Sequence, residues 1–135
     1  MKKQGILNSS ISKILSDMGH KDSVCIADCG LPIPTEITKI DLALSYGVPS
    51  FIDVLKVVLD DLEVEEIILA EEIKKENSKY LKEVKELLPN VIITYISHDK
   101  FKKEVNQSKA VIRTGDNKAY SNIILKSGIY FGEEK

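Results

Sequence analysis

The chain has 135 residues, of which 43% are hydrophobic and 30% charged, a composition typical of a folded globular domain. Its formal net charge of −2 provides no basic field that would attract nucleic acid or anionic lipid. No apolar run approaches the roughly 20 residues of a membrane span, and no signal-peptide pattern follows the basic N-terminus. Cys25 and Cys29 resemble reduced thiols. We therefore expect one cytoplasmic domain over residues 1–135 that binds neither membrane nor nucleic acid.

Helical and strand patterns alternate in the first half of the chain. Asn8, Ser9 and Ser10 offer N-cap side chains for a helix whose apolar residues recur at helical spacing up to Met18. The apolar run at residues 24–27 predicts a strand covered on both faces. A loop follows at residues 28–34, because one glycine and two prolines exclude a helix there. An extended segment within residues 37–44 and a helix over residues 50–62 complete this half.

The second half continues the alternation and ends with strands. The expected strands span residues 66–70, 91–96, 110–113, 122–125 and 129–131, and the expected helices span residues 77–88 and 101–105. Alternation of this kind favours helices packed on both faces of a parallel sheet. We therefore predict an α/β fold: a three-layer α/β/α single domain with a mostly parallel central sheet.

Polar side chains follow several of the predicted strands. Ligands of open α/β sheets bind beyond the carboxyl ends of the strands, and Asp28, Glu71 and His98 each come after such an end. Tyr120, Ser121 and Asn122 precede a late strand, so they reach the same edge if that strand runs antiparallel. Carboxylate and amide groups of this kind suit a small polyhydroxylated ligand, because they accept and donate hydrogen bonds to hydroxyls.

The only two histidines, His20 and His98, are candidate acid/base groups, because an unperturbed imidazole titrates at about pH 6.5. Structural roles are open for each candidate. His20 follows the helix-ending Gly19 and suits a helix C-terminus, whereas His98 is in place to cap the next helix, a role for which Asp99 is better suited. Asp28 is also typical of an Asx turn. Glu71 and Glu72 suit a solvated surface, and Cys25 suits the core.

Several kinds of catalytic site lack support in the sequence. Two histidines and an aspartate would suit a facial metal triad, but no His-x-x-x-His pair accompanies them. A metal-dependent hydrolase is therefore a minor alternative. The chain has no dinucleotide or phosphate-binding glycine loop. It also lacks a Gly-x-Ser-x-Gly motif and a Cys-x-x-Cys pair. The pattern favours chemistry that needs only proton transfer.

Several motifs are spread over nearly the whole chain. They are Leu-Asn-Ser at residues 7–9, Met-Gly-His-Lys-Asp at 18–22, Asp-Cys-Gly-Leu-Pro-Ile-Pro at 28–34, Gly-Val-Pro-Ser-Phe at 47–51, Ala-Glu-Glu-Ile-Lys at 70–74, Ser-His at 97–98, Ala-Val-Ile-Arg-Thr-Gly at 110–115 and Tyr-Ser-Asn-Ile-Ile-Leu at 120–125. Together these motifs resemble the D-ribose pyranases, small sugar-binding proteins of bacterial ribose-utilisation operons. The sister family of fucose mutarotases is less similar after Asp28, where it tends to carry a His-Phe-Pro type sequence. Ser121 departs from the alanine that is familiar in the family.

The resemblance implies interconversion of the pyranose and furanose forms of D-ribose without a metal or organic cofactor. It assigns His20 as the proton donor and Asp28, His98, Tyr120, Ser121 and Asn122 as sugar contacts. It also implies a cyclic homo-oligomer, typically a decamer of two stacked pentamers, with sites at subunit junctions. The alternatives are a mutarotase of another monosaccharide such as fucose and a sugar-binding module without turnover.

Overall fold

The fold is built around strand β1 (Ser23–Ala27), all five residues of which are buried. In the computed structural model, which describes residues 1–132, β1 lies inside a six-stranded sheet of order β2-β5-β1-β6-β3-β4. The other strands are β2 (Thr38–Asp41), β3 (Val64–Ala70), β4 (Ile92–Ile96), β5 (Ala110–Arg113) and β6 (Ile123–Ser127). Strand β6 runs antiparallel to both its neighbours, and the other paired strands are parallel. The predicted mostly parallel sheet is therefore confirmed.

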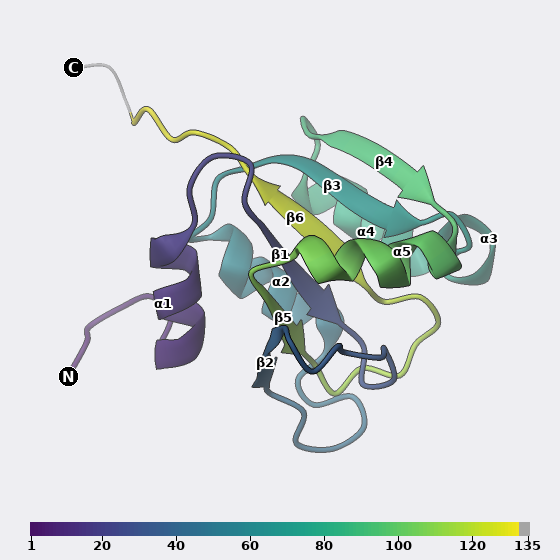
Figure 1. Ribbon diagram of the computed structural model, residues 1–135, viewed down its shortest axis with the longest axis horizontal. Helices are drawn as coiled ribbons and strands as arrows, with labels where there is room; N and C mark the ends of the chain where they lie inside the picture. The colour runs from purple at the N-terminus through teal and green to yellow at the C-terminus, as the bar shows by residue number, and fades with distance from the viewer. Residues whose placement is uncertain (133–135) are drawn as a thin grey trace.

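Helices cover both faces of the sheet, as Figure 1 shows with α5 in front of the strands and α2 and α4 behind them. The helices are α1 (Ser9–Asp17), α2 (Phe51–Leu59), α3 (Ile73–Glu76), α4 (Ser78–Leu87) and α5 (His98–Glu104), the last followed by a 3₁₀ turn, Val105–Gln107. Side chains alternate across a strand, so Val24 and Ile26 of β1 join the core under α1, α2 and α4. Cys25 joins a smaller core with Phe101 and Val105. The predicted three layers are confirmed.

Short polar side chains begin the helices. Asn8 accepts a hydrogen bond from the Ile11 amide and caps α1, as the sequence predicts. Ser97 caps α5 by accepting from the Lys100 amide, so neither His98 nor Asp99 takes that role. Within residues 1–132, no helix combines the length and apolar character needed to cross a membrane.

The strand predicted over residues 129–131 is wrong. Strand β6 ends at Ser127, and Ile129, Tyr130 and Phe131 are exposed and outside the sheet. The reason lies in the strand order, because β6 is already paired on both sides and the sheet edges belong to β2 and β4. These three consecutive apolar residues beyond β6 therefore have no neighbouring strand to pair with. The four-residue helix α3 was not predicted, since it is too short to show a helical period.

We expect Gly115→Ala to destabilise the protein. Gly115 donates its amide to the Pro49 carbonyl, and a Cβ there would collide with the carbonyl oxygens of Val48 and Ser45. Such overpacking costs about 1–3 kcal/mol. Denaturant unfolding at fixed protein concentration measures the loss. Gly19→Ala is the control, because its Cβ would meet only the Asp22 carboxylate at 3.8 Å. Equal stability of the two variants would contradict the close approach at Gly115.

Candidate functional site

One edge of the sheet collects the polar groups that follow the parallel strands. Asp28 follows β1, Glu71 follows β3, and His98 lies two residues beyond the end of β4. Strand β6 is antiparallel to β1 and β3, so residues 120–122, which precede it, lie at this same edge. The edge is therefore the one that strand order predicts for a ligand site.

Asp28 and Asn122 are joined side by side at this edge. The Asn122 Oδ1 accepts from the Asp28 amide at 2.8 Å, and its Nδ2 donates to Asp28 Oδ2 at 3.1 Å. The second carboxylate oxygen, Oδ1, accepts from the Gly30 amide at 3.0 Å, so Asp28 is an Asx-turn residue as well as a partner of Asn122. Asn122 is 1% exposed. The hydrogen bonds from Asn122 and Gly30 thus hold the Asp28 carboxylate in one orientation.

Burial raises the pKa of the Asp28 carboxyl, and the hydrogen bonds from Gly30 and Asn122 offset that effect only in part. Removing a carboxylate from water disfavours its charged form. A carboxyl that is partly buried, held by two neighbours and shifted in this direction is typical of a binding or catalytic group. The electrostatics therefore favour a functional role for Asp28 in addition to its turn.

His98 and Tyr120 form the other wall of the site. Their ring centroids are 5.2 Å apart with planes 80° from parallel, an edge-on contact. Nδ1 of His98 is buried and has no hydrogen-bond partner among the residues that the structure describes. A hollow of about 340 Å³ lies between these groups, lined by Asp28, Gly30, Leu31, His98, Ala119 and Tyr120. An unpaired polar atom on a residue that lines a hollow of this size suits a small polar ligand.

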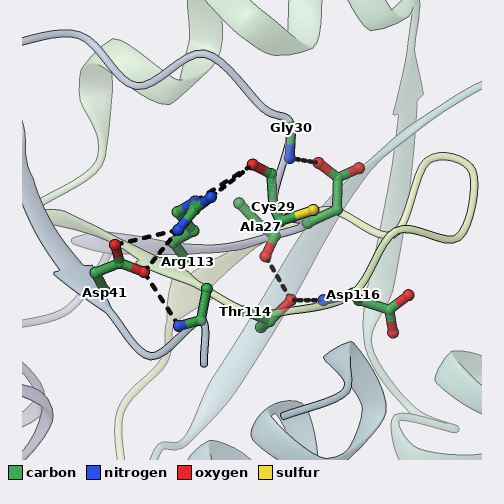
Figure 2. A network of polar contacts seen from close by, with 9 residues as sticks. Ala27, Cys29, Gly30, Asp41, Arg113, Thr114 and Asp116 are labelled. Atoms are coloured by element: carbon green, nitrogen blue, oxygen red, sulfur yellow. Dashed lines mark hydrogen bonds and ion pairs between the residues drawn. The ribbon is translucent and has the colours of Figure 1, made fainter. Parts of the chain in front are cut away.

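A second set of bonds fixes the loop that carries Asp28 (Figure 2). The Arg113 guanidinium donates to the Cys29 carbonyl at 3.2 and 3.3 Å and to both oxygens of Asp41 at 3.0 and 3.1 Å. The Thr114 hydroxyl donates to the Ala27 carbonyl at 2.8 Å, and the Cys29 amide donates to the Asp116 carbonyl at 2.8 Å. The Cys29 peptide is held from both sides, so Asp28 has little freedom to move.

Glu72 positions His98, and this role was missed in the sequence. Its two carboxylate oxygens accept from the His98 amide at 3.0 and 3.1 Å. In the sequence Glu72 follows Glu71, and the two look like a pair of surface acids. The contact between Glu72 and the His98 amide becomes visible only once α5 is placed. The predicted sugar contact Ser121 is fully buried and its hydroxyl donates to the Lys118 carbonyl, so this hydroxyl does not line the hollow.

His20 lies at the opposite edge of the sheet from Asp28. It precedes β1, whose five residues span about 16 Å at 3.3 Å each. Its Nε2 lies 2.9 Å from Glu65 Oε1, so it pairs with this carboxylate and not with the C-terminus of α1. Within one chain Asp28 therefore cannot orient His20. In residues 1–132, no three His, Cys, Asp or Glu side chains are grouped so as to hold a metal ion.

Comparison with known proteins places this geometry in a family. Residues 1–130 match the RbsD/FucU transport protein family. The chain is 53% identical to the D-ribose pyranase of Lactobacillus gasseri and 51% identical to that of Clostridium perfringens, over 97% of this chain and 100% of each relative.

Solved structures agree with this match. The structure of Bacillus subtilis RbsD complexed with D-ribose is 46% identical, with a TM-score of 0.94 over 97% of this chain and 100% of that one. The fucose mutarotase of Streptococcus pneumoniae, solved with L-fucose, shares the fold at 20% identity and a TM-score of 0.76, over 92% of this chain and 94% of its own. The chain belongs to the RbsD/FucU family.

Proposed function

We propose that this protein is an intramolecular isomerase that interconverts the pyranose and furanose forms of D-ribose by proton transfer alone. The observation that carries the proposal is identity of about half over the full length of relatives named D-ribose pyranase. The Bacillus subtilis relative, 46% identical, was solved with D-ribose. The hollow beside Asp28 and His98 is of a size and polarity that suit a monosaccharide.

The proposed reaction opens and recloses a hemiacetal. A base removes the proton from O1, the C1–O5 bond breaks, and O5 takes up a proton. The open-chain aldehyde rotates, O4 adds to C1 and loses its proton, and O1 regains one. Bonds and protons balance, so no oxidant, water or group carrier is consumed. Acid/base catalysis of this kind contributes about 10²- to 10⁴-fold.

We assign His20 as the group that exchanges protons with the sugar. Asp28 lines the hollow and accepts hydrogen bonds from sugar hydroxyls, and the buried Asn122, which is outside the lining, holds that residue in place through two bonds. His98 and Tyr120 supply the opposing wall. Ser121 contributes as part of the 120–122 segment, its hydroxyl being bonded to Lys118.

The separation of His20 from this hollow supports a site shared between subunits. His20 of one subunit would complete the hollow of another in a cytoplasmic homo-oligomer, for which we propose a decamer of two pentameric rings. Exposed apolar side chains, including Leu7, Leu44, Tyr46 and Phe131, suit burial in such an assembly. Two free thiols, Cys25 and Cys29, are in keeping with a reducing compartment.

The first test is His20→Ala. The variant should lose about 10²- to 10⁴-fold of the rate enhancement and keep its fold, because the side chain is 40% exposed. NMR exchange spectroscopy between the ring forms of D-ribose measures the rate. Lys85→Ala, an exposed change on α4, is the control. Wild-type exchange in the His20 variant would remove this residue from the mechanism.

Asn122→Ala should weaken D-ribose binding more than it affects folding. The substitution removes both hydrogen bonds to Asp28 and leaves that partner unpaired, which costs about 1–3 kcal/mol, or roughly 5- to 150-fold in affinity. Titration calorimetry with D-ribose measures the dissociation constant. Asn106→Ala is the matched control, because Asn106 is exposed and bonds only to the Lys103 carbonyl. An unchanged constant for the Asn122 variant would place this residue outside the site.

The shared site predicts complementation between inactive subunits. Inactive His20→Ala and Asn122→Ala proteins are dissociated, mixed and reassembled, with mixing confirmed by mass. If each site takes His20 and Asn122 from different subunits, about a quarter of the sites in a random cyclic mixture carry neither defect. Exchange activity should therefore return in part. Absence of recovery would show that each subunit builds its own site.

A further inference from the structure

We propose that Glu65 is the positioning residue of His20, holding the imidazole with its proton on Nε2 so that Nδ1 is the atom that exchanges protons with the sugar. This inference rests on the proposed function and specifies the acid/base group of the same site. It starts from the 2.9 Å contact between His20 Nε2 and Glu65 Oε1, which joins residues 45 positions apart in the chain.

The turn that carries His20 is held tightly against the end of β6. Within it, the Gly19 amide donates to Asp22 Oδ2 at 2.9 Å, and Lys21 has a φ of +72°, which non-glycine residues adopt at a cost. The Lys21 amide donates to the Ser127 carbonyl, and the Ser127 amide donates to the Asp22 carbonyl, both at 2.8 Å. The fold thus keeps a strained turn that fixes the backbone of His20.

Glu65 reaches His20 from an irregularity in β3. The pairing of β3 with β6 steps from Val64–Ser127 directly to Glu66–Lys126, which leaves Glu65 as the extra residue of a bulge. A bulge turns a side chain out of the regular alternation of a strand and is frequent beside active sites. A Cβ at Gly128 would meet the Glu65 Cβ at 3.3 Å. The absence of a side chain there leaves room for the bulged residue.

The pair is poorly explained as a stabilising contact. The side chains of His20 and Glu65 are 40% and 39% exposed, and exposed ion pairs contribute little to stability. Lys21 Nζ lies 3.6 Å from the same Glu65 oxygen, so the carboxylate would have a cationic partner without the histidine. The bulge at Glu65 and the strained turn at His20 meet in an exposed contact. We explain both features by a requirement for one orientation of the His20 imidazole.

The chemistry of the two groups determines which ring nitrogen is reactive. A carboxylate only accepts hydrogen bonds, so the bond to Glu65 requires a hydrogen on Nε2. In the neutral ring Nδ1 then carries the lone pair. Nδ1 makes no hydrogen bond to the residues that the structure describes. Nδ1 takes the proton from O1 and gives it to O5 as the C1–O5 bond breaks, then takes the O4 proton and gives it to O1 as the ring recloses. Glu65 stabilises the imidazolium in between, as an orienting acid does for a catalytic histidine.

The decisive variant is Glu65→Ala in the full-length assembled protein. We expect kcat for D-ribose ring exchange to fall about 10- to 100-fold, part of the full acid/base effect, while KM changes by less than about threefold, because Glu65 acts through His20 and not on the sugar. The ¹⁵N spectrum of histidine-labelled protein reads the tautomer, and only two imidazoles contribute. Wild-type His20 should be protonated on Nε2, and Glu65→Ala should shift it toward a mixture of tautomers.

Two further variants separate position from charge. Glu63→Ala removes a neighbouring exposed carboxylate and should keep the wild-type kcat and tautomer. Glu65→Gln keeps an acceptor oxygen, so it should recover at least about threefold in kcat over Glu65→Ala, short of wild type because a neutral acceptor bonds more weakly.

An unchanged kcat or an unchanged His20 tautomer in Glu65→Ala overturns the role of Glu65, as does an equal loss in Glu63→Ala. A wild-type protein that does not accelerate ribose exchange overturns the proposed function itself. The two failures are therefore distinguishable.

Discussion

Strand β6 connects the two edges of the sheet on which the candidate groups lie. Asn122, just before its first residue, bonds to Asp28 at the carboxyl edge. Ser127, its last residue, exchanges backbone hydrogen bonds with Lys21 and Asp22 at the other edge. Five residues at about 3.4 Å each set roughly 17 Å between these ends. Because one antiparallel strand fixes both edges, a single chain holds the proposed sugar-contact groups and His20 firmly in place but apart.

The two edges differ in how completely one chain builds them. The carboxyl edge is fixed within one chain, with Asn122 1% exposed and the Asp28 loop held by Arg113, Asp116 and Asn122. The His20–Glu65 pair is about 40% exposed on each side. A charged hydrogen bond is worth more where water is excluded, since the local dielectric constant falls. Packing of this edge against another subunit would therefore strengthen the orientation of His20 at the moment when a shared site forms.

Much of the architecture could be predicted because parallel strands are continuous apolar runs, as at the buried β1 and β5 and at the half-exposed edge strand β4. The rule that ligands bind at carboxyl ends then brought Asp28 and His98 to one edge. The sequence pattern left the direction of β6 open. It also wrongly predicted a strand at residues 129–131, because a strand forms only where a neighbouring strand is available to pair with it. Glu65 and Glu72 look like surface acids in the sequence. Glu65 is 45 residues from its partner His20, and a bulge in β3 brings them together. Glu72 is 26 residues from its partner His98, which lies at the start of α5.

The separation of acid/base and binding groups has a chemical consequence. Opening the ring moves protons at O1 and O5, so the proposed mechanism needs a proton-exchanging group that stays free until sugar arrives. A His20 imidazole bonded to Asp28 would be occupied by that carboxylate. Here His20 instead pairs through Nε2 with Glu65. His98, which lines the hollow with Asp28, makes no hydrogen bond to it, and burial raises the pKa of Asp28 although the charge of His98 lowers it in part. Because they lie at opposite edges of the sheet, His20 and Asp28 of one chain do not pair with each other. In the proposed assembly the sugar lies between His20 of one subunit and Asp28 of another.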